Sequence, residues 1–209
     1  MTEITKIKIT KKGRYALFCG EDFLFSLDEA TFTDNHIDKG MLLSDEDIEE
    51  LRKQSDYHKA LDRAFLILGV RDHSVFELKN KLCRDFDEET AVAAVERIEE
   101  LGYLDDRAFA ERYAAELAGK NRSMSEIRSR LAEKRVSREI IDEVSGGIDS
   151  DDRESIRQTI EKKYLRKLQA DGGRNKVYAA LIRRGFRSGD ISAVLREYNI
   201  AEEDYYGQE

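Results

Sequence analysis

Apolar residues recur at helical spacing through most of the chain, and the pattern itself repeats. Leu82, Leu131 and Leu181 lie 49 and then 50 residues apart. Each of them has an apolar residue three or four positions before it and another four or five positions after it, as one face of an amphipathic helix does. These flanking residues are Leu78, Phe86, Ile127, Val136, Val177 and Phe186. A further helical stripe precedes and follows each leucine, so the pattern predicts tandem three-helix repeats that form an elongated, curved body.

The first 43 residues follow a different pattern. Ile7 and Ile9 alternate with lysines, and the runs RYALFC and FLFSL are short and rich in aromatic residues. Because Gly20 lies between the two runs, they predict a β-hairpin. Lys12-Gly13 marks an earlier turn, and the segment after Gly40 is a further extended candidate. The fold class expected for the whole chain is mainly α, with a small N-terminal antiparallel sheet.

The predicted helix caps agree with an N-terminal sheet followed by three helical repeats. Ser44 precedes a run of acids, where a helix start is favoured by both the cap and the helix dipole. Ser74-x-x-Glu77 and Ser123-x-x-Glu126 match the capping-box pattern, and the double glycine at 172–173 takes the equivalent place in the third repeat. The expected organisation is a β-rich domain with a linking helix over 1–56, three-helix repeats over 57–104, 105–148 and 149–200, and an acidic tail over 201–209.

The stretch ELGYLDDRAFA joins the first two repeats. Its glycine is expected to end one helix in the left-handed conformation, and one of its two aspartates is expected to cap the next. The pair could instead be a metal or acid–base site, but adjacent residues at a helix start point in different directions and capping already accounts for them. The structural residues of the joint are Gly102, Tyr103, Leu104, Asp105, Asp106, Phe109 and Ala110.

Charge is unevenly distributed along the chain. The net charge is −8 and the isoelectric point is near 5.2, yet residues 120–138 carry +5 and residues 153–198 carry +7. Two basic islands in an acidic protein predict local contacts with the phosphates of a nucleic acid. The candidate contact residues are Arg122, Arg128, Arg130, Lys134, Arg135, Arg138, Lys163, Arg166, Lys167, Arg174, Lys176, Arg183, Arg184 and Arg187.

Other chemistry has little support in the sequence. The chain has two cysteines and three histidines, and none of them falls in a metal-binding spacing. Nucleotide-binding glycine loops are absent, as are a signal peptide and a membrane-spanning stretch. We therefore expect no catalytic, metal or cofactor site, a cytoplasmic location and no membrane association. Proline is also absent, which suits a succession of helices.

Several motifs resemble the RecX family of bacterial regulators of the RecA recombinase. They are RDHS at 71–74, ELKNKL at 77–82, FDEE at 86–89, ELGYLDDRAFA at 100–110 and SEIRSRLAEKRV at 125–136. The resemblance is firmest from Ala60 to Ile141, and the N-terminal segment is similar to the extension of longer members. The chain departs from the family pattern by one missing residue before Phe86 and by Lys134-Arg135 where the family has Lys-Gly.

The resemblance implies a function that composition does not show. RecX proteins bind RecA and its filament on single-stranded DNA and limit filament growth, ATP hydrolysis and strand exchange in recombination and the SOS response. It implies partners in RecA and DNA and no enzymatic activity, and we expect the chain to be a monomer. An autonomous helical nucleic-acid-binding protein is the alternative, since three-helix units can carry a recognition helix. The acidic isoelectric point counts against it.

Overall fold

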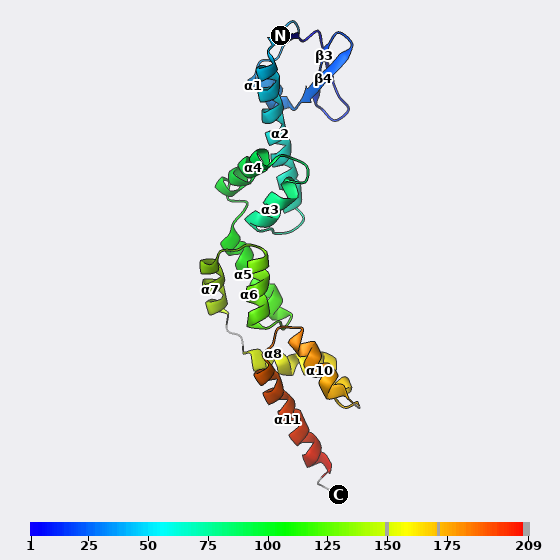
Figure 1. Ribbon diagram of the computed structural model, residues 1–209, viewed down its shortest axis with the longest axis vertical. Coiled ribbons are helices and arrows are strands. Elements are labelled where there is room, and N and C mark those ends of the chain that lie inside the picture. Colours follow the sequence, from blue (N-terminus) through cyan, green and yellow to red (C-terminus); the bar gives the residue numbers. More distant parts are fainter. Residues whose placement is uncertain (149–150, 171, 207–209) are drawn as a thin grey trace. The chain divides into compact units, whose positions relative to one another are not determined.

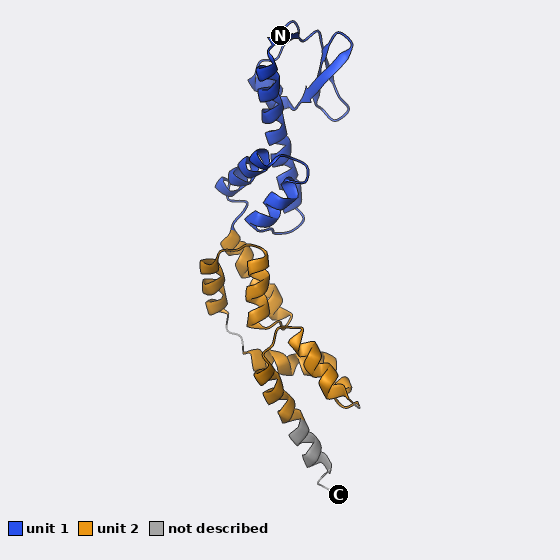
Figure 2. Cartoon of the chain, in the orientation of Figure 1, with its two compact units in different colours: residues 1–105 blue, residues 106–209 orange. Residues whose placement is uncertain are grey.

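The computed structural model describes the backbone of residues 1–148, 151–170 and 172–206, and side-chain surroundings as far as Tyr198 (Figure 1). The chain forms two compact units, Met1–Asp105 and Asp106–Glu209 (Figure 2). Unit 1 holds a small antiparallel sheet and the first helical repeat, and unit 2 is helical throughout its described residues. The predicted fold class, mainly α with an N-terminal sheet, is confirmed.

The N-terminal sheet contains the predicted hairpin. Strands β2 (Lys6–Ile9), β3 (Tyr15–Cys19) and β4 (Asp22–Leu27) pair antiparallel in that order. Gly20 turns the β3–β4 hairpin with φ of 62°, a conformation that glycine adopts without strain. A second, two-stranded pairing joins β1 (Thr2–Glu3) to β5 (Leu42–Leu43).

A short helix, α1 (Glu29–Asp34), was not predicted. Asp28 caps it and accepts hydrogen bonds from the Thr31 backbone N–H at 3.0 Å and from the Thr31 hydroxyl at 2.7 Å. Asp28 Oδ1 also lies 2.9 Å from Nδ1 of His58. Burial opposes ionisation of Asp28, but the hydrogen bonds outweigh it and lower its pKa to about 2. Six residues are too few to show a helical period in the sequence.

Helix α2 (Asp45–Leu68) is continuous across the predicted domain boundary at 56/57. Ser44 and the third helical residue, Asp47, form a reciprocal capping box with distances of 3.1 and 2.8 Å. With no glycine or proline inside it, the helix has no reason to stop at the boundary. Leu51 packs in the core of the N-terminal sheet, whereas Ala60 lies in the core of the first repeat. One helix therefore serves both cores.

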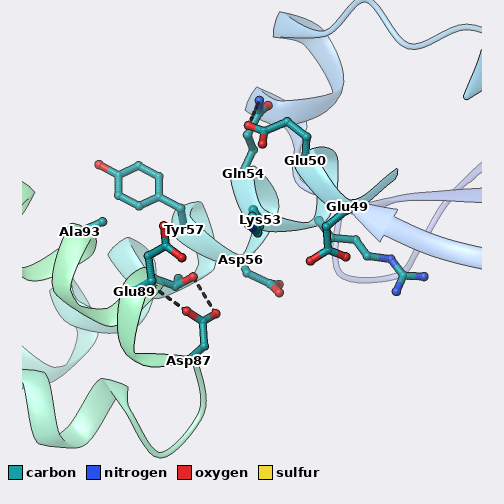
Figure 3. Close-up of a pocket in the computed structure, with 11 residues that line it drawn as sticks. Glu49, Glu50, Lys53, Gln54, Asp56, Tyr57, Asp87, Glu89 and Ala93 are labelled. Carbon is teal, nitrogen blue, oxygen red and sulfur yellow. Dashed lines mark hydrogen bonds between the residues drawn. The ribbon is translucent and has the colours of Figure 1, made fainter. Parts of the chain in front are cut away.

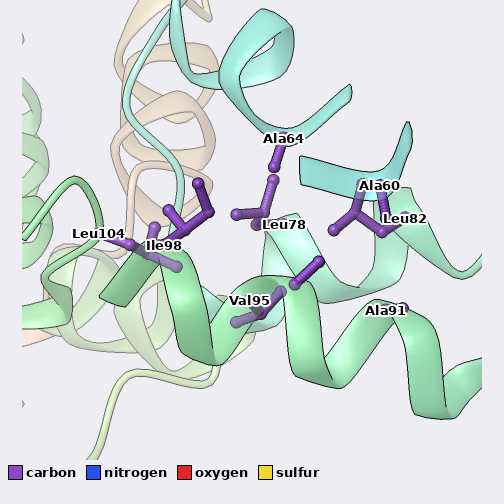
Figure 4. Packing of buried hydrophobic residues seen from close by; sticks show 9 residues of the cluster. Ala60, Ala64, Leu78, Leu82, Ala91, Val95, Ile98 and Leu104 are labelled. Atoms are coloured by element: carbon purple, nitrogen blue, oxygen red, sulfur yellow. The ribbon is translucent and has the colours of Figure 1, made fainter. Parts of the chain in front are cut away.

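The first repeat consists of the second half of α2, α3 (Val75–Leu82) and α4 (Glu88–Glu100). Its buried centre combines the stripe leucines with small residues (Figure 4). Alanines let the helices approach closely, and the larger side chains fill the space between them. The buried residues are Ala60, Ala64, Leu78, Leu82, Ala91, Ala94, Val95, Ile98 and Leu104.

The end of α4 has the geometry predicted for the joint. Gly102 has φ of 75°, and its N–H donates to the Glu99 carbonyl oxygen at 2.8 Å, while the Tyr103 N–H donates to the Ile98 carbonyl oxygen at 3.1 Å. Two such bonds around a left-handed glycine terminate a helix and satisfy its last carbonyls. The next helix, α5 (Asp106–Gly119), starts directly after Asp105. In the part of the chain that is described, no cluster of three His, Cys, Asp or Glu suits a metal ion.

The second repeat consists of α5, α6 (Met124–Glu133) and α7 (Arg138–Gly147). Ser123 caps α6 by accepting the Glu126 N–H at 3.1 Å. The predicted capping box is only half formed, because the Glu126 carboxylate binds arginines rather than the Ser123 backbone. Phe109 and Ala110, the last residues of the joint motif, are buried in the core of this repeat.

The third repeat is less regular than the second. Its elements are α8 (Asp152–Thr159), the π-helical turn η1 (Ile160–Tyr164), α9 (Leu165–Leu168), α10 (Gly173–Ile182) and α11 (Ser188–Tyr206). Ile156, Val177 and Phe186 meet in its core. The predicted tail at 201–209 continues the backbone of α11 as far as Tyr206, and 207–209 lie outside the described residues.

Candidate nucleic-acid interface

Six of the predicted contact residues in the third repeat are exposed basic side chains that form no ion pair among the described residues. They are Lys163, Arg166, Lys167, Lys176, Arg183 and Arg187. Lys163, Arg166 and Lys167 are spaced three and four residues apart, which places neighbours on one side of a helix. Lys176 on α10 and Arg183 at its C-cap are seven residues apart, which is the spacing of one helical face. Within the part of the chain that is described, these residues present positive charge without an acidic partner.

A tight turn brings α9 against α10. The Gly173 N–H donates to the Ala170 carbonyl oxygen at 2.7 Å. A Cβ atom at Gly173 would lie 1.8 Å from the Lys167 carbonyl oxygen, so no other residue fits there without movement of the backbone. Gly173, the first residue of α10, therefore has a packing role, which fixes the basic end of α9 beside the start of α10.

The basic residues of the second repeat are held differently. Arg122 Nη1 donates to both carboxylate oxygens of Glu126 at 3.2 Å, and Arg130 Nε and Nη2 donate to Glu126 Oε1 at 3.1 Å. The Glu126 side chain is only 11% exposed. One carboxylate on α6 thus sits between two of the predicted contact residues and compensates much of their charge.

Asp142 plays the same part for two more arginines. Arg128 donates to Asp142 from α6, and Arg138 Nε lies 3.8 Å from the same carboxylate. Lys134 and Arg135 also have interaction partners. Arg135 has φ of 58°, at the position where the family motif has glycine. All six of the predicted second-repeat contact residues therefore already have an interaction partner.

Two predicted contact residues have structural roles in the third repeat. Arg184 Nη2 donates to the carbonyl oxygens of Lys120 at 2.5 Å and Asn121 at 3.1 Å, just beyond the end of α5. Burial and the nearby Arg122 charge lower the pKa of Arg184. Arg174 Nη1 donates to the Leu195 carbonyl oxygen at 3.3 Å. Both guanidinium groups join helices within unit 2.

An acidic groove lies in unit 1, between α2 and the start of α4 (Figure 3). It has a volume of about 740 Å³, and its carboxylates outnumber its two basic side chains. Asp87 in this groove caps α4 and accepts from the Thr90 N–H at 2.9 Å. The lining residues are Glu49, Glu50, Arg52, Lys53, Gln54, Asp56, Tyr57, Asp87, Glu89, Thr90 and Ala93. The negative charge of the groove would repel the phosphates of a nucleic acid, so the groove and the basic side chains suit partners of opposite charge.

Sequence reasoning missed the compensating acids and the fit of Gly173. The 122/126/130 spacing of Arg, Glu and Arg predicts ion pairs on one helix, so Glu126 had a signal in the sequence. Asp142 pairs with Arg128 across fourteen residues and two helices, and Gly173 fits against a backbone carbonyl. Neither of these contacts has a local sequence pattern.

None of the helices described is both long and apolar enough to cross a membrane.

Comparisons with known proteins agree with the motifs. The family model described as "RecX, second three-helix domain" matches residues 105–144. A Cronobacter sakazakii protein named "Regulatory protein RecX" is 35% identical over 158 residues, which cover 70% of this chain and 96% of that protein. A Lactobacillus johnsonii protein of the same name is 35% identical over 156 residues, covering 73% of this chain. The chain spans only 57% of that relative's length.

A solved structure confirms the fold. The crystal structure described as that of "regulatory protein RecX" superposes with a TM-score of 0.66 at 22% identity, over 93% of this chain and 98% of that one. The match covers both the sheet-containing and the helical parts of the chain. Together with the near-complete match to the Cronobacter relative, these observations show that the chain belongs to the RecX family.

Proposed function

We propose that the chain is a cytoplasmic, monomeric regulator that binds the RecA filament on single-stranded DNA and inhibits it. Family membership supports the class of function, and the exposed, uncompensated basic side chains of the third repeat support a contact with phosphates. Lysines and arginines at a nucleic-acid backbone release counterions, which gives sequence-independent, salt-dependent binding. The effects proposed are slower filament growth, ATP hydrolysis and strand exchange.

The observation that carries this proposal is the contrast between net charge and local charge. The protein has a net charge of −8, which would repel free DNA as a whole. Six of the predicted contact residues, on α9, α10 and the adjoining turns, are nevertheless exposed and lack an acidic partner in the described part of the chain. A surface of this kind suits a phosphate backbone that a protein partner already holds in place, because the partner supplies the remaining affinity.

The acidic groove of unit 1 supports a second contact, with basic protein surface. Complementary charge at two places orients a protein on its partner and suppresses wrong orientations. In this proposal unit 2 contacts the DNA phosphates and the α2–α4 groove faces basic groups on RecA. The same division of charge disfavours an autonomous DNA-binding protein, which is usually basic overall.

The experiment is RecA's single-strand-dependent ATPase with the chain added below the molar amount of RecA. We expect hydrolysis to fall as the chain is added, because each bound molecule affects a stretch of filament. A matched series with surplus single-stranded DNA excludes simple sequestration of DNA, since inhibition through the filament should persist. Unchanged hydrolysis at every ratio would contradict the proposal.

A further inference from the structure

A basic hollow lies between α6 and α7 in unit 2. It has a volume of about 520 Å³ and is lined by Arg128, Ser129, Ala132, Arg135, Val136, Arg138 and Ile141. Three of its lining residues are arginines, and Val136 and Ile141, which also line it, are buried. A hollow lined by both cationic and apolar side chains suits a phosphate with the sugar that carries it, since each part meets a surface of its own kind.

Helix α7 adds to the preference for an anion. Its first residue, Arg138, lines the hollow, and Ser137 before it caps the helix at 3.3 Å from the Ile140 nitrogen. The first turn of a helix carries partial positive charge and N–H groups without an intrahelical partner. Arginine also binds phosphate through two parallel N–H groups, which gives geometric as well as electrostatic selectivity.

An internal carboxylate already pairs with two of the three arginines of this hollow. Arg128 donates to Asp142, and Arg138 Nε is 3.8 Å from it. The side chains of Arg128 and Asp142 are 43% and 50% exposed, so the pair is open to an incoming anion. Exposed ion pairs of this kind are weak, and a phosphate can replace the carboxylate without loss of a buried interaction.

We propose that the α6–α7 hollow binds one phosphate of single-stranded DNA and that Asp142 is the internal anion which this phosphate displaces. The inference rests on the proposed function and specifies how the second repeat takes part in it. Asp142 lowers the affinity of the hollow for free DNA. The hollow therefore fills when the strand is already held by the third repeat and by the protein partner.

The test uses the full chain and a short fluorescein-labelled oligothymidylate, with affinity measured by fluorescence anisotropy at several KCl concentrations. We expect Asp142→Asn to tighten binding by about two- to fivefold, the value of an exposed ion pair. Glu143→Gln is the matched control. It makes the same charge change on the next residue of α7, but Glu143 pairs with Arg107 beside a different hollow.

A double-variant cycle separates the hollow from general electrostatics. In an Arg128→Gln background, the gain from Asp142→Asn should largely disappear, because the phosphate has lost its principal partner. An equal gain in that background, or an equal gain from Glu143→Gln, overturns the inference. So does a wild-type chain that fails to bind the oligonucleotide in low salt. If the chain does not inhibit the RecA ATPase but the double-variant cycle shows coupling between Arg128 and Asp142, the phosphate site is supported and the proposed filament function is contradicted.

Discussion

The second and third repeats share one architecture but treat their basic residues differently. In the second, Glu126 and Asp142 hold four of the arginines predicted to contact DNA. In the third, six of the predicted contact residues are exposed without an acidic partner among the residues described. The two islands look alike when charges are counted along the sequence. The difference shows that the charge available to a partner depends on which acids the fold brings alongside.

The repeats also differ at the start of their middle helices. Ser123 caps α6 with its side chain, whereas α10 begins with glycines and has no side-chain cap. The N-cap position of α10 is Gly172, with φ of 62°, and a side chain at the first helical residue, Gly173, would collide with the Lys167 carbonyl. The start of α10 is therefore fixed by its close contact with α9 and not by a side-chain cap. This contact also positions the exposed basic residues.

The largest effect is expected from charge reversal in the third repeat. Changing Lys163, Arg166 and Lys167 to Glu should raise the concentration needed to inhibit the RecA ATPase by about a hundredfold, since three phosphate contacts become repulsive. Lys11, Lys12 and Lys39 to Glu is the control, because these lysines are also exposed and the change in net charge is identical. Equal loss in both variants would show that only net charge matters.

Gly173→Ala is expected to have the next largest effect. The added methyl group meets the Lys167 carbonyl, so we expect a loss of about 2 kcal/mol in the free energy of opening α10. Hydrogen exchange of the α10 amides measures this locally. Gly189→Ala in the same repeat is the control, because its Cβ meets nothing within 4 Å and alanine favours helix. Unchanged exchange rates of the α10 amides in Gly173→Ala would show that the backbone at the turn accommodates the methyl group without loss of stability.

Ser123→Ala tests how much the side-chain cap stabilises α6. Loss of the 3.1 Å bond to the Glu126 N–H should cost about 1 kcal/mol of stability in α6. The equivalent change at Ser137, an exposed cap with a 3.3 Å bond, should cost less. Both are measured by amide exchange of the capped helix. A larger loss of stability in the Ser137 variant would show that the buried cap, Ser123, is not the stronger of the two.

The smallest effect is expected from Glu126→Gln, which makes the second repeat more like the third. Arg122 and Arg130 lose their charged partner, and we expect affinity for oligothymidylate to rise by about twofold in low salt. Glu133→Gln on the same helix is the control, because Glu133 has no ion pair in the described part of the structure. An identical gain from both variants would rule out release of the arginines as the cause.

Much of the fold could be predicted because it depends on local patterns. The leucine spacing located the three repeats, and the serine caps and Gly102 located helix ends within a residue or two. The short α1 was missed because six residues show no period. The sequence predicted a linking helix before residue 57 and a separate helical stripe after it, because a change from one core to another looks like a boundary, although a single helix continues through it.

The candidate site was less predictable because its contacts are distant in sequence. Arg184 looks like any other arginine of the basic island, yet it donates to the Lys120 carbonyl, 64 residues away. Asp142 reaches Arg128 across two helices. Basic composition indicated where positive charge is concentrated. Only the packing of helices shows which side chains are already engaged and which are open to a partner.

The most direct test of the central claim is the salt dependence of oligothymidylate binding. The wild type is compared with a chain in which Lys163, Arg166 and Lys167 are changed to Gln, and the logarithm of affinity is plotted against the logarithm of KCl concentration. Each phosphate contact on a single strand contributes about 0.7 to the slope, so we predict a slope shallower by about 2 in the variant. Parallel lines would contradict the assignment of the phosphate contacts to the third repeat.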